Sequence, residues 1–336
     1  MATAVKEAVT FRYSHSIGRR ENGGLGFRVP VALTCGLDDV IYVVNRSAEY
    51  KGATRITMCT VGEEYVGEFG RGKSVDPPLV WPSGIAAESN GTIHVIDEWL
   101  NRVFTFTKDG EFIASWGSAG SGDGELNGPS GIECDAEDNL YVVDSKNNRI
   151  QKFTADGRFL GKFGGEGTDE GQFNLPWGID IDANGGIYVA DWRNDRVQKF
   201  SPDGEFIMGF GSSGIRDGEF DRPAGVAIDR DGTAYVADWR NDRVQVFDEN
   251  GIFLTKWLGD ATLHTAAMAK LDSNPDMWQQ RQVAFGLERE KLFWRPIAVE
   301  VDSQGRILAL DSLRMRIQVY LKIQPYFVGL YDGGRL

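Results

Sequence analysis

The sequence is poor in the residues that most often build metal sites and nucleophilic centres. Only three of its 336 residues are histidine, and only three are cysteine. The histidines are His15, His94 and His264, and the cysteines are Cys35, Cys59 and Cys134. A zinc site needs three or four converging ligands, and these spacings form neither a metal knuckle nor a disulfide framework. No Gly-x-Ser-x-Gly motif is present either, so the sequence does not indicate a complete catalytic centre.

Long apolar runs are also missing. No segment approaches the roughly 18 to 20 apolar residues that a membrane-spanning helix requires. Residues 1–16 lack the apolar core and cleavage site of a secretory signal, so we expect a cytoplasmic protein with reduced cysteines. The formal net charge of −13 repels nucleic acid unless a local basic patch reverses the field, which disfavours nucleic acid as a partner.

Glycine, in contrast, is abundant, and it marks an internal repeat. The 42 glycines lie beside aromatic and β-branched runs, a pattern typical of short strands joined by turns. Similar segments begin at Pro82, Pro129, Pro176 and Pro223, each 47 residues after the one before. Pro30 opens a degenerate first copy and Pro296 a last one. Each copy reads as four short strands that cannot bury both faces alone, which predicts radial stacking into a propeller.

The copies share the run Tyr-Val-x-Asp followed by Asn/Asp-Arg-Val/Ile-Gln-x-Phe, which resembles the NHL repeat. The resemblance covers nearly the whole chain and is weakest in the first copy, where Asn45 replaces the aspartate and the arginine element is scrambled around Arg55. It implies an all-β, six-bladed propeller of four-stranded blades forming one domain over residues 1–336. NHL propellers are often recognition modules. Other propellers similar to this one are lyases or hydrolases with a metal in the central channel, and some bind nucleic acid.

Two segments compete to close the ring. Residues 11–18 resemble a fourth strand followed by an inter-blade loop, and residues 325–332 occupy the fourth-strand position of the last blade. We favour the N-terminal segment.

An aspartate precedes an arginine by five residues in five of the six copies. The pairs are Asp97 with Arg102, Asp144 with Arg149, Asp191 with Arg196, Asp238 with Arg243, and Asp311 with Arg316. A catalytic pair is needed once, so a fivefold pair predicts a structural bridge between adjacent strands. Phe173 and Phe220, in the glycine-rich inter-blade loops, are expected to fill gaps between blades.

Functional residues are expected where the sequence departs from its own repeat. The fourth and fifth copies carry identical DWRNDRVQ segments, which place Trp192-Arg193 and Trp239-Arg240 side by side at the channel mouth. Trp177 is expected near the same mouth. Tryptophan and arginine are the residues most enriched at interface hot spots. The structural alternative is that the tryptophans only cover inter-blade grooves, with arginine stems over them.

The second break is an insertion at about residues 260–293, between the last two copies. Residues 273–276 resemble a helix start with an early proline, and a shorter helix is expected around residues 265–271. The longer helix carries Trp278. The insertion is expected to serve as a lid, a docking element or a plug.

The sequence thus favours a scaffold that recognises a protein partner through the loop face and the insertion. The alternative is a small-molecule lyase or hydrolase with the insertion as a lid over the channel mouth. The predicted binding residues are Trp177, Trp192, Arg193, Trp239, Arg240 and Trp278. Calcium held by carbonyls and carboxylates is compatible with a propeller channel, although no contiguous acidic loop marks a site.

Overall fold

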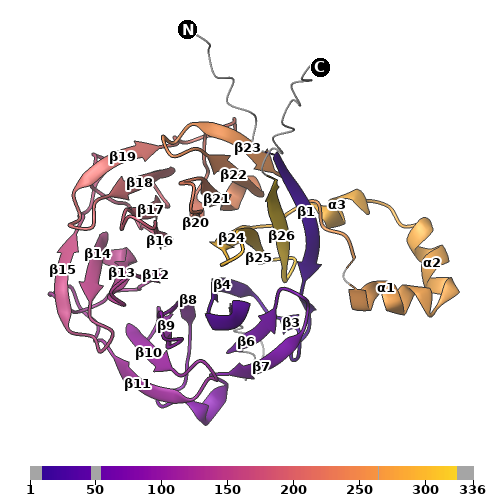
Figure 1. Ribbon diagram of the computed structural model, residues 1–336, viewed down its shortest axis with the longest axis horizontal. Helices are drawn as coiled ribbons and strands as arrows, with labels where there is room; N and C mark the ends of the chain where they lie inside the picture. The colour runs from indigo at the N-terminus through magenta and orange to yellow at the C-terminus, as the bar shows by residue number, and fades with distance from the viewer. Residues whose placement is uncertain (1–9, 47–53, 264, 324–336) are drawn as a thin grey trace, which may run out of the picture.

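The chain forms a ring of six sheets around a central axis. The structure is a computed structural model that describes residues 10–46, 54–263 and 265–323. Each sheet contains four antiparallel strands, and successive sheets follow one another around the ring (Figure 1). The six-bladed propeller predicted from the repeat is therefore confirmed.

The strands follow chain order from the channel outward in every blade except the last. Blade 1 contains β4 (Pro30–Cys35), β5 (Val40–Asn45), β6 (Arg55–Thr60) and β7 (Tyr65–Phe69). Blade 2 contains β8 (Pro82–Ala87), β9 (Ile93–Asp97), β10 (Arg102–Phe106) and β11 (Phe112–Trp116). Blade 3 contains β12 (Ile132–Cys134), β13 (Leu140–Asp144), β14 (Arg149–Phe153) and β15 (Phe159–Phe163). Blade 4 contains β16 (Ile179–Ile181), β17 (Ile187–Asp191), β18 (Arg196–Phe200) and β19 (Phe206–Phe210). Blade 5 contains β20 (Pro223–Ile228), β21 (Ala234–Asp238), β22 (Arg243–Phe247) and β23 (Phe253–Trp257).

Blade 6 joins the two ends of the chain. It contains β24 (Pro296–Val301), β25 (Arg306–Asp311), β26 (Arg316–Ile323) and, as its outermost strand, β1 (Thr10–Ile17). The N-terminal strand therefore closes the ring, as favoured from the sequence; residues 325–332 lie outside the described residues. On β1, Ile17 is fully buried and the Phe11 ring packs edge-on against Trp257 at 5.2 Å. The pairing with β1 covers the edge of β26 that faces away from the channel.

The hydrophobic core lies between the blades. Strand residues alternate between the two faces of a sheet, so each blade presents apolar side chains to both neighbours. One cluster joins Tyr141 and Val143 of blade 3 to Val189 and Phe200 of blade 4, all buried. Near the channel the blades approach so closely that a Cβ atom on Gly178 would lie 2.3 Å from the carbonyl oxygen of Ala224. The glycine two positions after the opening proline of blades 2 to 5 is thus required by the close approach of the next blade.

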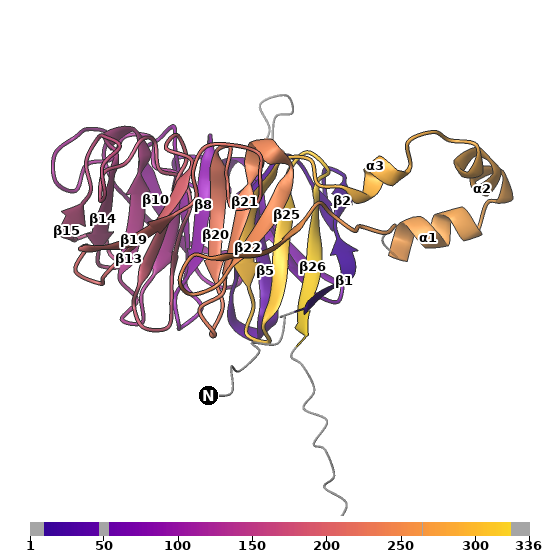
Figure 2. The ribbon, with the colours of Figure 1, turned by 90° about the horizontal axis from the view of Figure 1, so that it is seen from above.

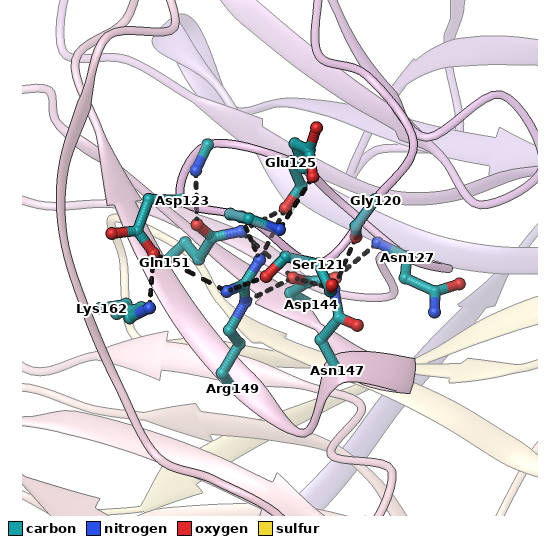
Figure 3. Close-up of polar contacts among 12 residues, drawn as sticks. Gly120, Ser121, Asp123, Glu125, Asn127, Asp144, Asn147, Arg149, Gln151 and Lys162 are labelled. Atoms are coloured by element: carbon teal, nitrogen blue, oxygen red, sulfur yellow. Dashed lines mark hydrogen bonds and ion pairs between the residues drawn. The ribbon is translucent and has the colours of Figure 1, made fainter.

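In blades 2 to 6, a buried aspartate at the end of the second strand holds the inter-blade loop, as Figure 3 shows for blade 3. In blade 3, Asp144 accepts hydrogen bonds from the backbone N–H of Asn127 at 2.6 Å and from Arg149 Nε at 2.7 Å. The other guanidinium N–H groups of Arg149 donate to the carbonyl oxygens of Ser121, Gly122 and Glu125. The same aspartate–arginine ion pair forms in blades 4, 5 and 6, at 2.9, 2.7 and 3.0 Å.

Blades 1 and 2 hold their inter-blade loops through other contacts. In blade 2, Asp97 accepts four backbone N–H bonds, and Arg102 donates instead to the Ser115 hydroxyl at 3.2 Å. Within the described chain, no Asp97–Arg102 ion pair occurs, so the predicted pairing is right for four of the five copies. In blade 1, the fully buried Arg55 pairs with Glu68 at 3.0 Å and donates to the carbonyl of Gly26 at 2.6 Å. The scrambled first copy therefore still anchors its loop through an arginine.

Short elements complete the structure. The paired segments β2 (Arg19–Arg20) and β3 (Gly26–Phe27) lie in the first inter-blade loop. The insertion contains α1 (Thr265–Asp272), α2 (Pro275–Gln282) and α3 (Glu288–Lys291). Four 3₁₀ turns, η1 to η4, span Leu37–Asp39, Gly72–Ser74, Ser145–Asn147 and Trp239–Asn241. No helix in the described part of the chain is both long and apolar enough to cross a membrane.

The predicted helix starts in the insertion are confirmed. Asn274 caps α2 by accepting the N–H of Asp276, with Pro275 in the first turn. The insertion leaves the ring between β23 and β24 and extends sideways, outside β26 and β1 (Figure 2). At its base, the N–H of Thr262 donates to the Tyr13 hydroxyl at 3.0 Å. In this structure the insertion stands beside the ring, and its role as a lid, a docking element or a plug stays a prediction.

We expect Arg149→Ala to lower the free energy of unfolding by about 3 to 5 kcal/mol, because it leaves a buried carboxylate and three carbonyl groups without their cation. Chemical denaturation measures this loss. Arg102→Ala is the matched control, since its arginine holds only a hydroxyl, and it should cost at most about 1 kcal/mol. Equal losses in both variants would contradict the anchoring role.

We expect deletion of residues 1–17 to lower Tm by at least about 10 °C, because it exposes the edge of β26 and the apolar surface under Phe11. Calorimetry and size-exclusion chromatography measure this effect. Deletion of residues 324–336 is the control and should leave Tm within about 2 °C of the wild-type value. The reverse ranking would mean that the C-terminal segment closes the ring.

Candidate functional site

Three tryptophans from blades 4 and 5 form a row at the channel mouth. Trp177 lies just before β16, Trp192 in the loop after β17, and Trp239 in the 3₁₀ turn after β21. The Trp177 and Trp192 ring centres are 6.1 Å apart, and the Trp192 and Trp239 ring centres are 6.2 Å apart. The identical segments of blades 4 and 5 thus place equivalent rings side by side, as predicted.

Arginines from three positions stack on this row. The guanidinium of Arg222 lies 4.5 Å from the centre of the Trp192 ring, and that of Arg295 lies 4.4 Å from Trp239. Arg193 approaches Trp192 at 5.8 Å. These distances fall within the range of cation–π attraction. We name this set the Trp–Arg arc; it consists of Trp177, Trp192, Arg193, Arg222, Trp239 and Arg295.

The backbone conformation at the starts of blades 5 and 6 fixes the positions of Arg222 and Arg295. Arg222 and Arg295 each precede the proline that opens a blade, and each has a φ of +60°. The N–H of Arg222 donates to Asp195 at 2.7 Å, and the N–H of Arg295 donates to Asp242 at 2.8 Å. These bonds hold a left-handed conformation that is rare for residues other than glycine. Neither arginine was predicted as a binding residue from the sequence, although both share one repeat position, where Gly128 stands in blade 3.

The arginines of the arc have spare hydrogen-bonding capacity. Among the described residues, the guanidinium groups of Arg193, Arg222 and Arg295 have no hydrogen-bond or ion-pair partner. The Nη1 atom of Arg295 is buried without a hydrogen-bond acceptor. In contrast, the Arg240 guanidinium faces Asp221 at 3.7 Å, and that of Arg46 faces Glu98 at 3.5 Å. A guanidinium carries five donors, so the arc offers several that a ligand could satisfy.

A small apolar cavity opens within the row. Its volume is about 120 Å³. It is lined by Arg46, Trp177, Trp192, Ala224, Trp239 and Ile297. An apolar cavity of about 150 Å³ accepts a benzene ring, so this cavity has room for one compact apolar group beside the cationic rim.

The structure brings together five of the six predicted binding residues. Trp177, Trp192, Arg193, Trp239 and Arg240 lie along the two identical segments and the adjoining blade start. Trp278 does not join them. It lies on α2, outside the ring, and its Nε1 donates to Asp272 at 3.2 Å (Figure 1).

Below the mouth, the channel is lined by three carboxylates. Glu133, Asp180 and Glu300 stand at one position of the first strands of blades 3, 4 and 6. Burial, with repulsion from Asp180, raises the pKa of Glu133 to about 8. Burial raises the pKa of Asp180 to about 7, although N–H bonds from Ile228 and Ile181 oppose the shift. Burial and repulsion from the other two raise the pKa of Glu300 well above its ordinary value.

These carboxylates were missed in the sequence, where they stand singly in apolar strands. Their common repeat register could have revealed them. In the described part of the chain, no group of three or more His, Cys, Asp or Glu side chains is arranged to hold a metal ion. Calcium binding in the channel stays an untested prediction.

The two described histidines, His15 and His94, do not converge on the mouth. The buried His94 bonds Glu88 at 2.5 Å and Thr105 at 3.2 Å, inside blade 2. His15 bonds the carbonyl oxygen of Val61 at 2.7 Å. His264 lies outside the described residues. All three cysteines are free.

Comparisons with known proteins agree with this architecture. A family described as 6-bladed beta-propeller matches residues 82–163, and the NHL repeat matches residues 173–200 and 220–247. This protein is a six-bladed propeller that contains NHL repeats. The sequence has no significant match among functionally curated proteins.

Solved structures share the fold of this NHL propeller. A structural genomics protein of unknown function from Bacteroides thetaiotaomicron is 18% identical, with a TM-score of 0.65 over 94% of this chain and 76% of the other. A virginiamycin B lyase from Staphylococcus aureus is 14% identical, with a TM-score of 0.54 over 94% of this chain and 100% of the other. Hydrazine synthase from Kuenenia stuttgartiensis is 14% identical, with a TM-score of 0.53 over 88% and 96%. At these identities the similarity describes the fold alone.

The raised pKa values of the channel carboxylates predict how the free energy of unfolding depends on pH. Because their pKa values are raised in the folded protein, the folded state holds protons that the unfolded chain releases above about pH 4. The free energy of unfolding should therefore fall as pH rises from about 4 to 8. Glu300→Gln should reduce this fall and raise the unfolding free energy at pH 8.5 by about 1 to 3 kcal/mol.

Denaturant titrations between pH 5 and pH 8.5 measure this effect. Glu111→Gln is the control, because Glu111 is exposed in the turn between β10 and β11 of blade 2. This variant should keep the wild-type pH dependence of the unfolding free energy. An unchanged pH slope in Glu300→Gln would show that the channel carboxylates do not repel one another.

Proposed function

We propose that this NHL propeller is a binding scaffold that recognises a protein partner through the Trp–Arg arc, with the insertion as a second contact. The observation that carries the proposal is the row of three tryptophans with stacked arginines at the channel mouth. Aromatic and arginine side chains beside a small pocket are the composition of protein interface hot spots.

The arc is more than a cover for the grooves between blades. The inter-blade grooves are already filled by other side chains, such as the fully buried Phe173 and Phe220. Trp192 is only partly buried, and Arg193 beside it is exposed. Stacking holds the arginines in place before a partner arrives, which lowers the entropic cost of binding.

The insertion supplies exposed apolar side chains outside the ring. Phe285 is fully exposed and Val283 is 74% exposed, although both are large apolar residues. The helix α2 ends at Gln282, and Gly286 follows with a φ of +76°, so these two residues lie in a connection between α2 and α3. Such side chains favour contact with another protein over contact with a small molecule in the channel.

A lyase or hydrolase has weaker support. Three solved neighbours are named as streptogramin B or virginiamycin B lyases, but the likeness concerns the fold. The insertion stands beside the ring, and the described histidines are engaged within the blades and the closing strand. Neither feature supplies a catalytic group to the arc.

The test compares proteins retained by the immobilised wild type and by the Trp192→Ala/Trp239→Ala variant. We expect the double variant to lose a specific set of partners, since it removes two of the three rings. Trp99→Ala is the matched control, because this tryptophan lies at the corresponding loop of blade 2, is 74% exposed and belongs to no stacked row.

Quantitative mass spectrometry of the retained proteins gives the readout, and thermal melting verifies that both variants are folded. Identical protein sets for the wild type and the double variant would refute recognition through the arc.

A further inference from the structure

We infer that the arc recognises an acidic segment of its partner, an extended stretch with several Asp or Glu side chains and one apolar or aromatic side chain. This inference rests on the proposed function and names the chemistry of the partner.

Charge complementarity is the first argument. The guanidinium groups of Arg193, Arg222 and Arg295 have no acceptor within the described chain, although the protein has a net charge of −13. The carboxylates nearest in the backbone network, Asp195 and Asp242, accept the backbone N–H groups of Arg222 and Arg295. Carboxylates from a partner can take the remaining donors, because guanidinium and carboxylate match in geometry.

Partial burial strengthens these contacts. Arg222 and Arg295 are partly buried against indole rings, and one nitrogen of Arg295 is buried without an acceptor. A buried donor without an acceptor costs free energy until it is satisfied. A carboxylate beside Arg295 would remove this cost, so binding gains more there than at a fully hydrated arginine.

The dimensions favour a peptide segment. The three rings are spaced 6.1 and 6.2 Å apart in succession, with arginines on the second and third rings. Alternate side chains of an extended chain are about 6 to 7 Å apart, so successive side chains on one face can meet successive rings. The apolar cavity of about 120 Å³ between the rings would take the apolar side chain.

The net charge of the protein favours a short acidic segment over nucleic acid as the ligand of the arc. Charges are screened beyond about 8 Å at physiological ionic strength, so the field at the arc depends on the charges close to it, which are its arginines and the carboxylates of Asp195 and Asp242. A short acidic segment places its charges at the arc only. A nucleic-acid backbone would extend past the arc and over the rest of an acidic protein.

The experiment measures the binding of a fluorescent peptide in which glutamates flank a central phenylalanine. Its counterparts carry glutamine or lysine in place of glutamate. We expect the glutamate peptide to bind at least about tenfold more tightly than the glutamine peptide, with affinity falling as salt is added. Fluorescence anisotropy gives the affinities.

Two variants test the arginines. Arg222→Gln/Arg295→Gln should weaken binding of the glutamate peptide by about tenfold or more, and the exposed Arg193→Gln should weaken it without any effect on Tm. The control is Arg216→Gln, because Arg216 is 85% exposed, pairs with Glu219 and lies outside the arc. It should bind the peptide as the wild type does.

The possible outcomes separate this inference from the proposed function. Equal binding of the glutamate and glutamine peptides, or wild-type binding by both arginine variants, would overturn the inference. Tighter binding of a single-stranded oligonucleotide than of the glutamate peptide would overturn it as well. If partners are lost in Trp192→Ala/Trp239→Ala but retained in Arg222→Gln/Arg295→Gln, the proposed function stands and the acidic segment is excluded.

Discussion

The buried aspartate that ends the second strand of blades 2 to 6 makes the interactions on which the rest of this propeller depends. In blades 3 to 6 it pairs with an arginine of the third strand, and this arginine holds the loop that leads into the blade. The aspartate also accepts a backbone N–H from that loop, as Asp144 does from Asn127. Each of these blades is therefore locked internally and tied to the incoming chain by one buried charge pair.

Burial and the arginine shift the pKa of the aspartate in opposite directions. Burial raises the pKa of Asp311 to about 6, while Arg316 opposes the shift. A buried ion pair does not necessarily stabilise a protein more than apolar residues would, but removing one partner is costly. The pair is thus best understood as a device that fixes the position of the loop. The Trp–Arg arc depends on it, because Trp192 and Trp239 directly follow the anchoring aspartates Asp191 and Asp238.

The same repeat produces two sites with opposite electrostatics, the Trp–Arg arc at the mouth and the three carboxylates in the channel. Both arise where equivalent positions of different blades carry side chains of one kind. At the mouth, aromatic rings and cations attract each other and remain available to a ligand. Inside the channel, Glu133, Asp180 and Glu300 repel one another and hold protons near neutral pH. The ring brings such residues together although they are far apart in the chain.

The sequence by itself determined the fold and much of the arc. The spacing of 47 residues, the period-two strands and the recurring Asp–Arg pair specify six four-stranded blades, because each signal is local or repeats regularly. The identical segments of blades 4 and 5 pointed to Trp192 and Trp239 for the same reason. Blade 1 was harder to interpret, since Glu68 replaces the usual partner of its arginine.

Only the tertiary structure decided which residues of different blades meet. Arg222 and Arg295 became part of the arc because left-handed backbone at two blade starts places their guanidinium groups over rings of other loops. The insertion lies outside the ring, and at its base Thr262 bonds Tyr13 of the closing strand. These contacts join residues far apart in the chain, and local periodicity carries no information about them. The ring geometry determines them.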